Sequence, residues 1–445
     1  MFVSFAQFII NTDFQMLIIV LPKIGLQFDL PAPALTGLIT VDAIFYASLI
    51  MAGGRLADIW GQKRCCILGL CLFGVGGLLL MLSIGLPMLL VARAFQGAGA
   101  ALISPSIFSL MTAIPVSSER RRAYRMFGSV QGASLIVGPL FGGTLTSAFG
   151  WRSAYVLETA VVTGLLVAIG RIVPSKASSV VSRKFDMLGA VLVGAAIVLF
   201  VAAVAGIGGS QLDARNRSIS AVLAALCLLL LIVVESKSRS PLIPPAVLGV
   251  PRVITALLGM SFALAGSMAF YLLPNLLMQQ ILHWPAAEAG LGVLPNAFAV
   301  ICASQGIAYL HRKLSPEINI SLGFLLMLVA LILYSLLLHP TTYTRSILFP
   351  MLIGGCGGII SIMAMMADAA SAVGENDQGV IAALGFTAQQ LGIAIGSAVI
   401  LSRASGLGVD RLIGSIQHAF LISAIFVMVG AACAVGLRHL VSSMR

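Results

Sequence analysis

Four ionisable residues, Asp13, Asp42, Arg93 and Glu158, lie within long apolar stretches of the chain. A charged side chain in hydrocarbon is energetically unfavourable, so it usually faces a partner or a water-filled cavity. A carboxyl group in a low dielectric can couple proton binding to a change of conformation. The pattern therefore makes Asp13 and Glu158 candidate proton-binding residues, Arg93 a residue that faces a partner or a polar cavity, and Asp42 a candidate lining residue of such a cavity.

Each of these residues also has a purely structural interpretation. Asp13 lies nine residues before Pro22 in its apolar stretch and could simply be neutralised by hydrogen bonds. Arg93 could belong to a structural buried ion pair. Asp42 and Glu158 both fall in the outer part of their stretches, and Asp42 could meet water at the surface. The sequence leaves these alternatives open.

Composition places the elements that must position these residues in a membrane. The chain has 445 residues, of which 59% are hydrophobic and 9% charged, and its mean hydropathy is +1.07. Soluble proteins carry about 25% charged residues. We therefore predict an all-α integral membrane protein embedded in the lipid bilayer.

The net charge of +11 is explained by basic residues in short loops, so we expect no nucleic-acid partner. The seven cysteines all lie in apolar runs and lack metal-ligand spacing with histidines, so no metal site is expected. No phosphate-binding Gly-Lys-Thr loop is present, which argues against ATP as a driving force. No catalytic triad or haem pattern is found, and we expect neither enzymatic activity nor a cofactor.

A spanning helix needs about 20 apolar residues, and the sequence predicts fourteen of them. They lie near residues 4–26, 35–56, 65–85, 88–113, 126–148, 153–172, 187–207, 218–234, 253–281, 287–310, 319–338, 346–368, 380–402 and 416–437. Basic residues concentrate in the loops on one side, which also holds both termini. The positive-inside rule makes that side cytoplasmic.

Two Ser-, Pro-, Lys- and Arg-rich stretches divide the chain. We predict a six-helix half over 1–172, linkers with two inserted helices over 173–252, and a second six-helix half over 253–445. Residues 306–313 echo the charged hairpin of the first half but lack its acid. Paired halves around a central cavity are the usual construction of secondary transporters.

That charged hairpin, residues 54–64, follows the second apolar stretch. Its predicted gating residues are Gly54, Arg55, Asp58, Gly61, Lys63 and Arg64. Glycines allow two helix ends to approach closely, and Asp58 can accept hydrogen bonds from a helix N-terminus or pair with an arginine. The hairpin could thus act as a releasable latch, whereas the basic residues alone would serve only as topology anchors.

Further motifs follow in order along the chain. One contains Arg93, Gln96, Gly97 and Gly99, and another Gly138, Pro139, Gly142 and Gly143. The second half contains Pro274, Gln279, Gly290 and Pro295, and then Gln390, Gly392 and Gly396. Together with the hairpin, these motifs resemble the fourteen-helix drug:proton antiporter branch of the major facilitator superfamily over nearly the whole chain.

The resemblance implies an exporter whose two halves rock about a central site, driven by the proton gradient. It implies that Asp13 carries the proton, that Arg93 regulates it, and that the Gly138–Gly143 motif is a seal favouring antiport over uptake. The chain departs from the family pattern at Gln15, Ile18 and Ser134. Asp42 and Glu158, which stand where an aromatic and an asparagine are usual, suggest a cavity for cationic cargo or a second proton site.

The expected function is export of small hydrophobic, cationic compounds by a monomer in the bacterial inner membrane. Predicted cavity residues are Asp42, Gln96, Asn275, Gln279, Phe298, Phe386 and Gln389. One alternative is a dedicated exporter of a single endogenous metabolite, such as an antibiotic, a siderophore or a sugar. Another is a membrane receptor or structural protein that transports nothing.

Overall fold

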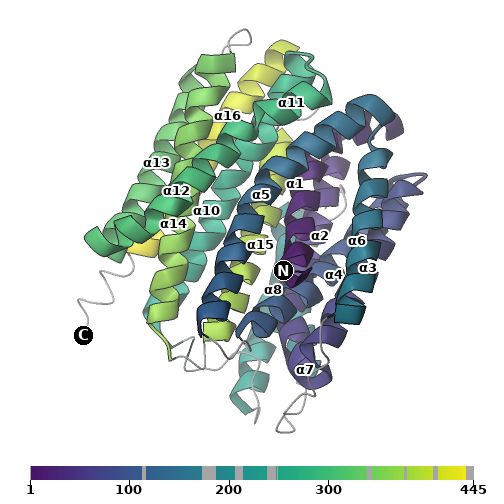
Figure 1. Ribbon diagram of the computed structural model, residues 1–445. Helices are drawn as coiled ribbons and strands as arrows, with labels where there is room; N and C mark the ends of the chain where they lie inside the picture. Colours follow the sequence, from purple (N-terminus) through teal and green to yellow (C-terminus); the bar gives the residue numbers. More distant parts are fainter. Residues whose placement is uncertain are drawn as a thin grey trace. The chain divides into compact units, whose positions relative to one another are not determined.

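A computed structural model describes residues 2–112, 117–172, 187–205, 214–237, 247, 249–337, 343–374, 378–403 and 409–436. These residues form helices and no strands (Figure 1). Twelve of the helical stretches are long and apolar enough to cross a membrane. The all-helical membrane prediction is therefore confirmed, but the count of fourteen spans is not.

The predicted inserted pair accounts for the difference in count. The two helices are α7 (Met187–Ala205) and α8 (Ala214–Lys237). Within the part of α7 that the structure describes, the apolar stretch is Val191–Ala203, and α8, which begins with Arg215 and Arg217, is not among the twelve. The first predicted linker, 173–186, lies outside the described residues.

The chain divides into two compact units, which we treat separately. The first holds residues 1–30, 37–242 and 286–290. Its remaining helices are α1 (Phe2–Phe28), α2 (Ala32–Trp60), α3 (Gln62–Met81), α4 (Leu86–Thr112), α5 (Ser117–Phe149) and α6 (Arg152–Ile172). Within it α3 packs between α4 and α6, and α1 packs along α5 (Figure 1).

Glycines set the close spacing of these helices. A Cβ atom on Gly99 of α4 would lie 2.6 Å from the Gly69 carbonyl oxygen of α3. A Cβ on Gly97 would collide with the Asp42 carbonyl of α2. Lipid is as apolar as leucine, so packing of this kind replaces the hydrophobic effect as a source of helix association.

The hairpin between α2 and α3 is tighter than the sequence suggested. Gly54, Arg55 and Asp58 belong to the last turns of α2, and α3 starts at Gln62. Gly61 alone breaks the helix, with a φ of 92°, a conformation that glycine adopts without steric strain. The predicted charged loop is thus mostly helix, since one glycine suffices to reverse the chain.

A cluster around Arg152 ties together the ends of three helices. Its guanidinium donates hydrogen bonds to the carbonyls of Met81 (3.1 Å) and Ser83 (2.8 Å) and to Gln27 Oε1 (2.9 Å). Trp151 Nε1 donates to the same Gln27 oxygen at 2.6 Å. Because Gln27 is on α1 and Met81 on α3, the start of α6 is held against both helices.

The second unit holds residues 31–36, 243–285 and 291–445. Its helices are α10 (Pro251–Leu276), α12 (Leu294–Lys313), α13 (Pro316–Leu337), α14 (Phe349–Ser371), α15 (Gln378–Arg403) and α16 (Val409–Ala431), with the short α11 (Ala286–Gly292) divided between the units. Single π-helical turns occur at η1 (Leu277–Ile281), η2 (Thr344–Leu348) and η4 (Ala432–Gly436). Such turns are rare and frequently mark functional positions.

The glycine contacts generate a first prediction. Gly99→Ala should lower the unfolding temperature in detergent. The added methyl overpacks the α3–α4 contact, which typically lowers the free energy of unfolding by about 1–3 kcal/mol. Gly164→Ala on α6 is a matched control, since nothing lies within 4 Å of its added Cβ. Equal unfolding temperatures for the two variants would contradict this account of α3–α4 packing.

Candidate functional site

The predicted ionisable residues of the first unit meet in one buried group, here called the Arg93 cluster. It consists of Asp13 on α1, Asp42 on α2, Arg93 and Gln96 on α4, and Glu158 on α6. Arg93 and Gln96 are fully buried, and Asp13 and Glu158 are 3% and 8% exposed. Asp42 is 15% exposed, so the structure does not place it in open solvent.

Arg93 pairs with two acids at once. Its Nη1 donates to Asp13 Oδ2 at 2.8 Å, and its Nε donates to the Leu38 carbonyl at 3.2 Å. Its Nη2 lies 3.2 Å from Asp42 Oδ2, an ion pair without the alignment of a hydrogen bond. The planar guanidinium suits this task because its donors point in fixed, divergent directions.

Gln96 connects the remaining carboxyl to the group. Its side-chain oxygen accepts a hydrogen bond from Arg93. Its amide nitrogen donates to Asp13 Oδ1 at 3.2 Å and to Glu158 Oε1 at 2.8 Å. The amide therefore bridges two carboxyl groups, and its orientation is fixed by the guanidinium on the other side.

Helix geometry and small residues make this arrangement possible. Arg93 and Gln96 are three residues apart, so both side chains lie on one face of α4. Gly76 of α3 leaves room for Gln96, because a Cβ there would lie 2.6 Å from its Cγ. A Cβ on Gly77 would lie 3.5 Å from Glu158 Oε1. A larger residue at position 76 would displace Gln96, and one at position 77 would collide with Thr159 Oγ1, which is 2.7 Å from the Cβ position.

The charge balance of the cluster is its main chemical property. Arg93 is the one cation among three carboxyl groups: Asp13 and Asp42 pair with it directly, and Glu158 is linked to it through Gln96. Two unit charges about 4 Å apart interact by about 4 kcal/mol at an effective dielectric of about 20. The excess of acid therefore favours binding of protons or of a small cation.

A second polar network was missed from the sequence. The Tyr46 hydroxyl of α2 and Ser104 Oγ of α4 are 2.6 Å apart, and Ser104 Oγ donates to Gln7 Oε1 of α1 at 2.8 Å. All three residues are buried. Tyr46 lies one helical turn after Asp42, so this spacing could have indicated the network. A neutral polar residue in an apolar stretch is a weaker indication of a buried partner than a charged one.

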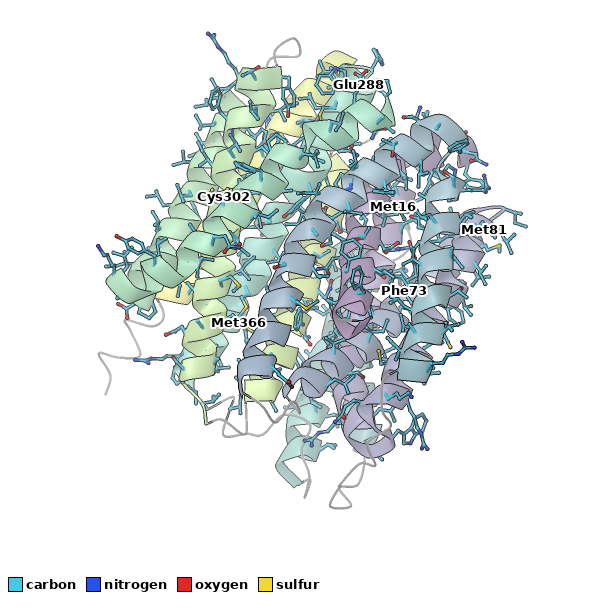
Figure 2. The ribbon with its side chains drawn as sticks, viewed as in Figure 1. Met16, Phe73, Met81, Glu288, Cys302 and Met366 are labelled. Carbon is cyan, nitrogen blue, oxygen red and sulfur yellow. The ribbon has the colours of Figure 1, made fainter. Side chains whose placement is uncertain are left out.

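The motif containing Gly138, Pro139, Gly142 and Gly143 lies on α5 and faces α1. A Cβ on Gly138 would lie 2.6 Å from Gln15 Cβ, and one on Gly142 would lie 2.8 Å from Cγ of Met16, which is labelled in Figure 2. Pro139 and Gly143 pack against the 286–290 segment of the same unit, since Gly290 abuts the Pro139 carbonyl. The motif thus brings α5 close to the helix that carries Asp13.

One hairpin residue, Lys63, makes a contact that the latch prediction did not include. Lys63 Nζ donates to the Gly170 carbonyl of α6 at 2.8 Å, where a cation interacts favourably with a helix C-terminus. Arg55 is half-buried and Arg64 is exposed. The Asp58 side chain lies outside what the structure describes, so the latch remains a prediction.

The cargo candidates of the second unit lie on α10, α12 and α15. Asn275 is buried and accepts a hydrogen bond from Gln279 Nε2 at 2.9 Å, across the start of η1. Phe298 is 63% exposed, and Phe386 and Gln389 are half-buried. Their involvement in cargo binding remains a prediction. Among the described residues, no group of three or more His, Cys, Asp or Glu side chains could hold a metal ion.

Known proteins resemble this chain in sequence and in fold. The cephamycin export protein CmcT of Amycolatopsis lactamdurans is 30% identical over 89% of this chain and 82% of its own length. The lincomycin resistance protein of Streptomyces lincolnensis is 30% identical over 90% and 83%. A solved proton-dependent oligopeptide transporter has the same fold, with a TM-score of 0.69, 15% identity, and coverage of 100% of this chain and 99% of that one.

The family profile described as Major Facilitator Superfamily matches residues 3–397. This match covers most of the chain and agrees with the relatives over both units. With the twelve apolar helices, it identifies a multi-pass membrane transporter, which is not an enzyme. The chain belongs to the major facilitator superfamily, among relatives that export antibiotics or confer resistance to them.

Proposed function

We propose that this protein is a proton-coupled antiporter that exports small hydrophobic, cationic compounds. The observation that carries the proposal is the Arg93 cluster, in which two carboxyls pair with a single guanidinium and a third is linked to it through Gln96. A site of this composition binds either protons or a cation, because both relieve the same excess of negative charge. Competition between the two couples proton entry to cargo exit.

Asp13 is the proposed carrier of the coupled proton. It is 3% exposed and receives hydrogen bonds from both Arg93 and Gln96. Its helix packs directly on α5 through Gly138 and Gly142. Neutralisation of Asp13 would weaken its pairing with Arg93. A resulting shift of α1 would alter its packing against α5.

The proposed setting is the bacterial inner membrane, with both termini in the cytoplasm. This orientation follows from the bias of basic residues toward one set of loops. We propose that α7 and α8 cross the membrane as an additional pair, that the two six-helix halves rock to give alternating access, and that the transporter acts as a monomer.

A second candidate is export of one dedicated compound. The relatives favour this reading, because cephamycin and lincomycin are each named as a single antibiotic. Both candidates use the same fold and the same proton site. They differ only in how selectively the cargo is recognised.

Transport by everted membrane vesicles should distinguish the two candidates. With an imposed pH gradient, we expect uptake of several unrelated lipophilic cations, such as ethidium and tetraphenylphosphonium. Each should compete with the others, because one acidic cluster attracts them all. Transport of a single compound from a broad panel would refute multidrug export and support dedicated export.

Asp13→Asn should abolish transport driven by a pH gradient in proteoliposomes, a loss of at least about 100-fold, because asparagine cannot exchange a proton. Asp29→Asn is the matched control and should transport normally. Asp29 is an exposed acid just beyond the end of α1, where its positive φ suits asparagine as well. Normal proton-driven transport by Asp13→Asn would disprove the assignment of Asp13.

A further inference from the structure

Three basic residues gather where α3 begins and α6 ends. Lys63 and Arg64 lie in the first turn of α3, and Arg171 lies in the last turn of α6. The Lys63 ammonium donates a hydrogen bond to the Gly170 carbonyl at 2.8 Å, which joins the two helix ends. Each arginine is the chain neighbour of one partner in this bond, so the bond brings both arginines to the same end of the helix pair.

This basic end carries charge that its own helices do not neutralise. Both arginines are exposed, and among the described residues neither forms an ion pair. α3 contains no acid, and the one acid of α6, Glu158, belongs to the buried Arg93 cluster. Lys63 uses one of its three N–H donors on the Gly170 carbonyl, which leaves two. The site therefore offers positive charge and hydrogen-bond donors to an anion from outside.

An exposed apolar stripe continues along each helix from its arginine. On α3 the exposed residues that follow Arg64 at helical spacing are Leu68, Cys71, Val75 and Leu78. On α6 those that precede Arg171 are Val167, Gly164 and Ala160. The two helices lie side by side (Figure 1). The α3 stripe is about 21 Å long at 1.5 Å per residue, which exceeds the depth of hydrocarbon in one leaflet, about 15 Å.

Trp60 indicates the depth of the basic end in the bilayer. It is 55% exposed, and only Gly61 and Gln62 separate it from Lys63. Exposed tryptophans are enriched at the boundary between hydrocarbon and headgroups, because the indole combines an apolar ring with one N–H donor. The three cations therefore lie at the depth of the lipid headgroups.

We propose that this end of the α3–α6 pair binds the headgroup of an anionic phospholipid, such as phosphatidylglycerol, whose acyl chains lie along the apolar stripes. Basic pockets between transmembrane helices bind such headgroups. The lipid phosphate accepts hydrogen bonds from Lys63 Nζ and from the two guanidinium groups, whose planar donors match phosphate oxygens. The bound lipid supplements the Lys63–Gly170 bond in holding α6 against α3.

Quenching of tryptophan fluorescence by brominated lipids tests this site. The full-length protein is reconstituted in phosphatidylcholine bilayers with a small fraction of brominated phosphatidylglycerol or, in parallel, of brominated phosphatidylcholine. The Trp60 signal is the difference between the wild type and Trp60→Phe, which keeps Trp151 and Trp284. We expect several-fold stronger quenching of Trp60 by the anionic lipid. Equal quenching by the two lipids would overturn the proposal.

Charge variants show whether the arginines select the lipid. Arg64→Gln combined with Arg171→Gln should abolish the preference, because each cation near an anionic surface strengthens binding about fivefold. The corresponding double lysine variant keeps the charge and should retain most of the preference. Arg345→Gln is the matched control, since it removes an exposed arginine on η2 of the second unit. A folded double glutamine variant that still prefers the anionic lipid would contradict the proposal.

The wild type alone supplies a test that does not depend on the folding of any variant. Salt screens exposed charges, so sodium chloride should reduce the preference for the anionic lipid, and an unchanged preference would contradict headgroup recognition. Sodium phosphate of equal ionic strength should act no more strongly than chloride. A stronger effect of phosphate would assign the site to free phosphate instead of lipid. None of these measurements involves transport, so their outcome is independent of the proposed function.

Discussion

A guanidinium buried inside a membrane protein requires compensating charge, and this requirement organises the first unit. Arg93 is fully buried on α4, and it draws Asp13 from α1 and Asp42 from α2 into one group. Removing either partner of such a pair leaves an unpaired buried charge, which typically destabilises a protein by about 3–5 kcal/mol. The ion pairs therefore constrain which faces of three helices can meet.

Small residues let the surrounding helices come close enough to satisfy that constraint. Gly97 lies against the backbone of Asp42, and Gly76 lies against Gln96. Gly138 brings α5 against the turn of α1 that contains Asp13 and Gln15. The glycines of α3, α4 and α5 thus allow the helices around the polar cluster to pack closely. Because α5 packs on the turn of α1 that carries Asp13, a change of charge at Asp13 can alter the position of α5.

The sequence was informative where physics leaves few choices. A charge inside an apolar stretch must face a partner, so the residue types alone group Asp13, Arg93 and Glu158. The bridging role of Gln96 and the network of Gln7, Tyr46 and Ser104 depend on side-chain contacts between helices, which no single stretch encodes.

The prediction of a loop for the hairpin was wrong. Its charged residues indicated a solvent-exposed loop, whereas Gly61 alone turns the chain and the residues on either side are helical. The two predicted spans that correspond to α7 and α8 are not among the twelve apolar helices of the described residues.

The central claim is that protons and cargo compete for the Arg93 cluster. The most direct test is proton release from purified protein in weakly buffered detergent solution, followed with a pH indicator as ethidium is added. We expect that ethidium binding releases protons from the wild type, and that a variant with Asp13, Asp42 and Glu158 replaced by their amides releases none. Ethidium binding without any proton release from the wild type would contradict it.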